Sequence, residues 1–169
     1  MLQATNRVAP SRVAASADGE RYSPASFLLA QVGAHAASQF ADRLGKLQLA
    51  PRHAGILRIL NSSPAITQQA LAATLNMVPS RLVALLDEME NRALIERRAN
   101  PDDRRSYAVH ITEIGRSTLR AISVIAREHS QALLAALSDD ELHQLASLLQ
   151  RVAEQQGLTP GVHPGYHSE

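Results

Sequence analysis

Residues 67–112 carry the pattern that most constrains the fold of this chain. Thr67 is a hydroxyl cap at the start of a short helical segment, and Pro79 is a suitable first residue for a longer one. The longer segment has apolar residues at helical spacing, namely Leu82, Leu85, Leu86, Met89 and Ala93. Two strand-like segments, 94–98 and 107–111, then flank the turn residues 100–103. The pattern predicts helix, turn, helix and β-hairpin.

The segments on either side of this pattern predict long helices. Ser23 and Pro24 begin one that runs to about residue 46, and Pro51 begins another that stops at residues 61–64. Thr112 caps a further helix to about residue 137, and Ser138 with Glu141 forms a capping box that begins the last one. The expected fold class is mainly α with a small β-hairpin wing: a winged helix-turn-helix between long N- and C-terminal helices.

This order predicts the division of the chain. Residues 1–22 are expected to form a disordered leader, 50–112 the winged helix-turn-helix, and 157–169 a flexible tail. Residues 23–49 and 113–156 are expected to be dimerisation helices, because their apolar rows would leave much apolar surface exposed in a monomer. Packing of those rows within one chain is the alternative.

Composition excludes several classes of protein. The chain has no cysteine, which removes disulfides and thiolate metal sites. No apolar run is long enough to span a bilayer, so we expect a cytoplasmic protein. His163 and His167 lie in a Gly/Pro-rich tail without a carboxylate cluster, so no metal site is expected there. No nucleophile–base pair or phosphate loop is recognisable, which predicts a non-enzyme without a cofactor.

The formal net charge is only +1, so any DNA-binding surface must come from local clustering. On the longer helix, Ser80, Arg81 and Ala84 lie away from the apolar stripe and are predicted to contact DNA. Arg81 is suited to a guanine or a phosphate, and Ser80 to either. Asp87 is a poor neighbour for phosphates and is expected to orient an arginine of the wing. A merely solvated helix face is the alternative.

The wing is rich in arginine. Arg97, Arg98, Arg104 and Arg105 flank the turn and outnumber Asp102 and Asp103, a local balance of 4 − 2 = +2. Arginine on both sides of such a turn predicts contact with the DNA backbone or minor groove, first through Arg105 and second through Arg104. Asp103 is expected to help orient the wing. A hairpin kept soluble by mixed charge is the alternative.

Thr67 and Gln68 are candidate phosphate donors because they lie at the positive end of a helix. Simple capping of that helix explains the same residues equally well.

With these motifs the chain resembles the multiple-antibiotic-resistance regulator (MarR) family over about residues 24–155. The resemblance rests on Asp103-Arg104-Arg105, on Ile111-Thr112 followed by Gly115, and on the segments 85–87 and 94–97. It implies a homodimeric repressor whose recognition helices enter successive major grooves of a pseudo-palindromic operator. It also implies release from DNA by a small aromatic or phenolic ligand. One departure is Ala84, where many relatives carry a basic residue; Arg81, one turn earlier, is the candidate replacement.

The resemblance places His35 and His53 where relatives build a ligand pocket, and Ala54-Gly55 would leave room beside them. Ordinary partly buried histidines and close helix packing explain the same residues as well. The two functions to be separated are a ligand-responsive dimeric repressor and a winged helix used for protein–protein assembly without ligand response. Four wing arginines favour the first, because a protein-binding wing does not need them.

Overall fold

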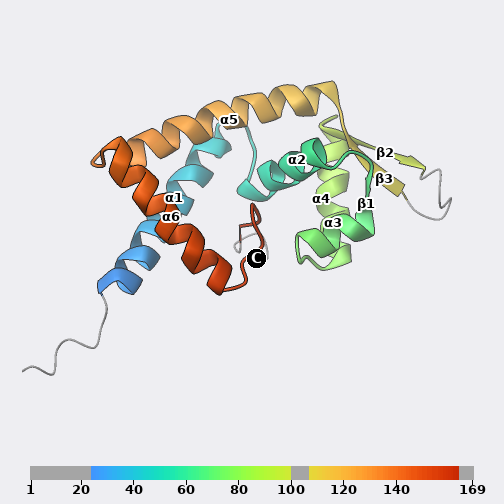
Figure 1. The fold of residues 1–169 in the computed structure, drawn as a ribbon. Coiled ribbons are helices and arrows are strands. Elements are labelled where there is room, and N and C mark those ends of the chain that lie inside the picture. Colours follow the sequence, from blue (N-terminus) through green and yellow to red (C-terminus); the bar gives the residue numbers. More distant parts are fainter. Residues whose placement is uncertain (1–23, 100–106, 164–169) are drawn as a thin grey trace, which may run out of the picture. The chain divides into compact units, whose positions relative to one another are not determined.

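The computed structural model describes residues 24–99 and 107–163 (Figure 1). Their elements, in chain order, are α1 (Pro24–Gly45), α2 (Pro51–Ser62), β1 (Ile66–Thr67), α3 (Gln68–Thr74), α4 (Pro79–Asn91), β2 (Ile95–Ala99), β3 (Tyr107–Ile111), α5 (Glu113–Leu133) and α6 (Asp139–Gln155). The chain divides after His35 into two units. In the first unit, the described residues 24–35 form the beginning of α1. The second contains the remaining elements.

Local chemistry explains where the helices of the second unit begin. Proline stands at the start of α2 and of α4, as predicted. The Thr67 hydroxyl accepts a hydrogen bond from the Ala70 amide at 3.2 Å, and the Thr112 hydroxyl accepts one from the Gly115 amide at 3.0 Å. The capping box at Ser138 is also present, because its amide donates to Glu141 at 2.8 Å. The helix-start predictions are therefore confirmed.

The sheet has three strands in the order β1-β3-β2. β2 and β3 form the predicted antiparallel hairpin, in a register that pairs Ile95 with Ile111 and Ala99 with Tyr107. β1 was not predicted: it is two residues long, which is too short for a periodic signal, and it pairs Ile66 with Val109. This strand ties the beginning of α3 to the base of the hairpin.

Two helix predictions need correction. The sequence predicts Ala93 in the buried stripe of the longer helix, but α4 ends at Asn91 and Ala93 is exposed at a φ of 54°. The chain turns there, and the next residue, Leu94, is buried at the start of the hairpin. The helix that follows the hairpin ends at Leu133 rather than near residue 137.

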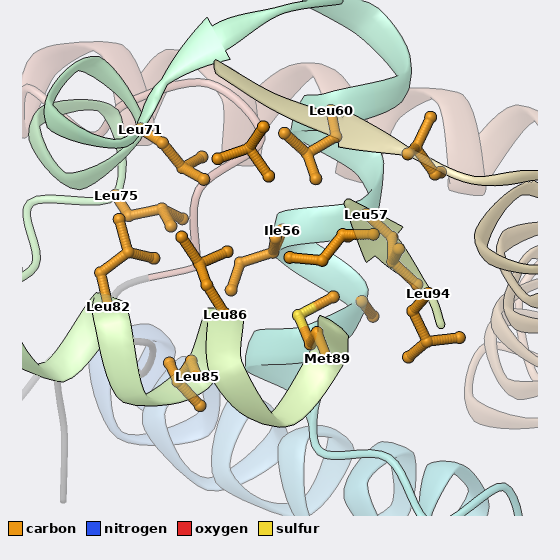
Figure 2. Close-up of a cluster of buried hydrophobic side chains, with 14 of the residues drawn as sticks. Ile56, Leu57, Leu60, Leu71, Leu75, Leu82, Leu85, Leu86, Met89 and Leu94 are labelled. Carbon is orange, nitrogen blue, oxygen red and sulfur yellow. The ribbon is translucent and has the colours of Figure 1, made fainter. Parts of the chain in front are cut away.

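The core lies between α2, α3, α4 and the hairpin. Figure 2 shows Ile56 and Leu60 of α2 facing Leu71 of α3 and Leu86 of α4. These four side chains are at most 1% exposed. Burying one such aliphatic side chain stabilises a fold by about 1.5–3 kcal/mol. Helix α4 thus packs on an aliphatic core.

Gly115 allows α5 to approach the hairpin closely. A Cβ atom at this position would lie 2.0 Å from the Leu94 carbonyl oxygen and 2.8 Å from the Ile111 side chain. The Thr112 hydroxyl, which caps α5, also donates to the Ala93 carbonyl at 2.6 Å. The first turn of α5 is therefore fixed against the base of the wing, and only glycine fits there.

The last helix differs from the rest of the second unit, because α6 has no buried residue. Its Leu148, Leu149 and Val152 are 48%, 39% and 46% exposed. Beyond it, Val162 is partly buried against the core cluster. Among the described residues, no single helix is long and apolar enough to cross a membrane. Helices α3 and α4 taken together would be long and apolar enough, but the pair is bent by 112° between them.

Candidate nucleic-acid interface

The outward face of α4 is a row of residues at helical spacing: Ser80, Val83, Ala84 and Asp87. It lies opposite the buried stripe of Leu82, Leu85, Leu86 and Met89. Ser80, Ala84 and Asp87 are exposed, Val83 is 42% exposed, and Arg81 is half-buried at the edge of the row. Val78, which precedes the helix, is 65% exposed. The helix therefore presents a hydroxyl, short apolar side chains, an arginine and the carboxylate of Asp87.

Arg97 of β2 braces the wing against α4. Its guanidinium lies 2.7 Å from the Asp87 carboxylate and 2.9 Å from that of Glu90, and it donates to the Val83 carbonyl at 3.3 Å. Its backbone amide donates to Glu90 at 2.9 Å. The side chain is only 16% exposed. One arginine thus joins the strand to the helix turn that carries Val83 and Asp87.

This geometry confirms the pairing predicted for Asp87 with a wing arginine. It does not support the prediction that Arg97 itself contacts DNA, because its terminal nitrogens are engaged within the protein. The alternation of side chains along β2 could have predicted which arginine faces α4. Arg97 lies two residues after the buried Ile95 and so shares its face, toward α4, whereas Arg98 shares the opposite face with Glu96.

Arg98 is the wing arginine of the described part that faces solvent. Its side chain is 62% exposed and pairs with Glu96, an exposed contact of little energetic value. Arg98, His110 and Arg116 line a surface pocket together with Glu96 and residues from the end of α2. The positive charge there is partly compensated. Hydrogen bonds from Arg120 and Arg116 lower the pKa of nearby Glu113.

Thr67 has a structural role in this fold, since it caps α3 and belongs to β1. Capping therefore accounts for it, and Gln68 beside it is half-buried. Arg104, Arg105 and Asp103 lie outside the described residues.

A series of polar contacts links α2 to α4 on the side away from the outward row of α4. His53 is 3% exposed, and its Nδ1 accepts a hydrogen bond from the Ala50 amide at 2.9 Å. Its Nε2 lies 3.3 Å from a Glu88 carboxylate oxygen, an electrostatic contact without hydrogen-bond geometry. Glu88 lies 3.9 Å from Arg92, which donates to the Gln48 carbonyl at 2.7 Å. These contacts connect the segment before α2 with the end of α4.

Burial lowers the pKa of His53 below its usual value, although the Glu88 carboxylate opposes this shift. His53 is therefore neutral at physiological pH, with its proton on Nε2 because Nδ1 accepts a bond. Ala54 and Gly55 are buried, and Ala54 belongs to the core cluster. His35 is exposed in the first unit. His53 is thus joined to α4 by Glu88.

The short helix α3, the exposed helix α4 and the braced hairpin together define a winged helix-turn-helix protein. The sequence profile of the MarR family matches residues 47–106. The solved structure of the transcriptional repressor CouR bound to a 23-mer DNA duplex is 30% identical, covering 76% of this chain and 91% of that one, with a TM-score of 0.68. This chain belongs to the MarR family of transcriptional regulators.

Other relatives agree with this assignment. A putative transcriptional regulatory protein for the hcr operon of Thauera aromatica is 34% identical over 106 residues, which span 63% of this chain and 64% of that protein. This chain thus matches less than two thirds of the length of that relative. Apo MarR from E. coli, at 23% identity, has the same fold, with a TM-score of 0.70 over 79% of this chain and 98% of that one. These relatives are regulators and not enzymes.

Proposed function

We propose that this protein is a homodimeric transcriptional repressor that binds a pseudo-palindromic DNA operator through α4 and the wing. The observation that carries the proposal is the Arg97 brace, which locks the wing against an exposed α4. A fixed angle between helix and wing suits simultaneous contact with a major groove and the neighbouring backbone. The relative CouR, at 30% identity, is a repressor bound to duplex DNA. Such a role places the protein in the cytoplasm.

Dimerisation is proposed from the exposed apolar side chains of the terminal helices. In α6 these are Leu148, Leu149 and Val152, and in the first unit they are Phe27, Leu28, Leu29 and Val32. A second copy of the chain would cover such rows and would also supply a second recognition helix. Two half-sites about one helical turn apart then follow from the geometry of dimeric helix-turn-helix proteins.

Ligand response is the finer part of the proposal, and it rests on the family resemblance and on the polar contacts between α2 and α4. A small aromatic or phenolic acid that engages His53 would compete with Glu88 for the imidazole, and Glu88 lies on α4. His35, Ala54 and Gly55 remain the other proposed pocket residues. A tenfold loss of operator affinity requires only about 1.4 kcal/mol of coupling between the two sites.

The decisive experiment is selection of bound duplexes from a randomised pool, followed by binding titrations of the enriched sequence. We expect enrichment of an inverted repeat. Arg105→Ala and Arg98→Ala should weaken binding to all sequences and make its salt dependence shallower, as loss of a phosphate contact does. Arg81→Ala should reduce the preference for particular base pairs if the arginine contacts a base. Absence of any enriched sequence would favour the protein–protein assembly module instead.

A further inference from the structure

The outward row of α4 has polar side chains at its two ends, Ser80 and Asp87, and apolar side chains at its centre. Val83 and Ala84 occupy the centre of the outward row, and Val78 stands exposed just before the helix. Exposed valine in a helix gains nothing from burial and is a weaker helix former than alanine. The Val83 and Ala84 side chains form a short apolar strip that can pack against an apolar group of a partner.

In a DNA major groove, that group is the thymine C5 methyl. It is the apolar feature that distinguishes thymine there, whereas guanine, adenine and cytosine present hydrogen-bond donors and acceptors. Ala84 and Val83 have no donor or acceptor in their side chains to read such groups. From their exposure we infer that Val83 and Ala84 read thymine methyl groups, so that each half-site contains thymines at the positions facing the centre of α4. This inference rests on the proposed DNA-binding function.

The surroundings of Val83 fix it for such a contact. Arg97 donates to the Val83 carbonyl at 3.3 Å and pairs with Asp87 one turn later. The pairing also compensates the charge of Asp87, the acidic member of the outward row, which would otherwise repel phosphates. The half-buried Arg81 lies at the edge of the row and Arg98 is exposed on the wing. The valine is thus held in an apolar strip with positive side chains near it.

Deoxyuridine tests this inference, because it differs from thymidine only by the missing methyl. The operator is first obtained by selection, and each thymine of a half-site is then replaced singly by uracil. We expect about a fourfold loss of affinity at each contacted position, since burying one carbon group is worth about 0.8 kcal/mol. Uracil in the flanking sequence should have no effect.

Protein variants tested on the same pairs of thymine and uracil operators show which residue contacts each methyl group. Val83→Ala should abolish the thymine–uracil difference at one position of each half-site and leave it unchanged elsewhere. Leu158→Ala beyond the end of α6, another truncation of an apolar side chain at a similar exposure of 47%, should keep every difference. The inference is overturned if uracil is tolerated at all positions, or if Val83→Ala retains the wild-type pattern. If no sequence is enriched at all, the proposed function fails and this inference fails with it.

Discussion

The winged helix-turn-helix and the last helix differ in whether their apolar side chains are buried within one chain. In the first region, Leu57, Leu71 and Leu86 are fully buried within one chain. In α6 no residue is buried, although Leu142, Leu145 and Leu149 recur at helical spacing. The winged helix-turn-helix thus buries its apolar side chains within one chain, whereas α6 leaves its apolar row unburied, as the proposed dimer would require. Stability and assembly should therefore respond to different substitutions.

The largest effect should come from placing a charge in the apolar row of α6. Leu149→Glu should raise the dimer dissociation constant at least a hundredfold, since burying an unpaired carboxylate costs on the order of 3 kcal/mol or more. Sedimentation equilibrium would measure this change, and circular dichroism would show that helicity is retained. Ser147→Glu adds the same charge to the same helix away from the row and should leave the dimer intact. Equal dimer dissociation constants for both variants would refute the proposal that the apolar row of α6 lies in the dimer interface.

The next effect concerns the brace inside the winged helix. Arg97→Ala should lower the free energy of unfolding by about 2 kcal/mol, because the charged contacts with the Asp87 and Glu90 carboxylates are lost. Denaturant titration measures this loss, and operator affinity should fall with it. Arg98→Ala on the next residue is the matched control: its side chain is 62% exposed, so stability should hardly change.

Arg97→Lys separates charge from geometry. A lysine keeps the positive charge but cannot reach both carboxylates and the Val83 carbonyl with a planar fork. Its unfolding free energy should lie near that of the alanine variant. A lysine variant as stable as wild type would mean that the brace is only a charge contact.

These two regions were predictable to different degrees. Helix starts at Pro51, Thr67, Pro79 and Thr112 followed from capping chemistry, which is local and visible in the sequence. β1 was missed because two residues carry no period.

The site itself was predicted in part. The outward row of α4 followed from helical spacing. The contacts of Arg97 with Asp87 and Glu90 were not predicted as a set, because they depend on which face of β2 the arginine occupies. The contact of His53 with Glu88 joins residues 35 positions apart, which no local pattern reveals.

A smaller effect is expected at the junction of the two regions, where Thr112 caps α5. Thr112→Val should lower the free energy of unfolding by about 1 kcal/mol, because the Gly115 amide loses its acceptor. Thr112→Ser keeps the hydroxyl and should stay close to wild type. Thermal unfolding followed by circular dichroism compares them. If the valine variant unfolds like the serine variant, the hydroxyl contributes nothing and α5 is held by packing at Gly115 alone.

The smallest effect should be a pH dependence that originates at His53, inside the self-contained region. Burial lowers the pKa of this histidine, so the folded chain binds its proton less readily than the unfolded chain does. The resulting stability is fully present above the usual pKa of 6.5 and is lost as pH falls through the lower folded value. Protonation also removes the acceptor for the Ala50 amide, which weakens the beginning of α2.

The groups facing this imidazole are Glu88, Arg52 and Arg92, and burial outweighs the attraction of Glu88. His53→Gln keeps an acceptor for the Ala50 amide, as glutamine does in a capping box, but cannot titrate. Its unfolding temperature should fall less than that of wild type between pH 7.5 and 5, while the other histidines contribute equally to both proteins. Glu88→Gln should steepen the fall, because the carboxylate that favours the protonated ring is gone. Parallel pH profiles for wild type and His53→Gln would show that the buried histidine has no part in acid sensitivity.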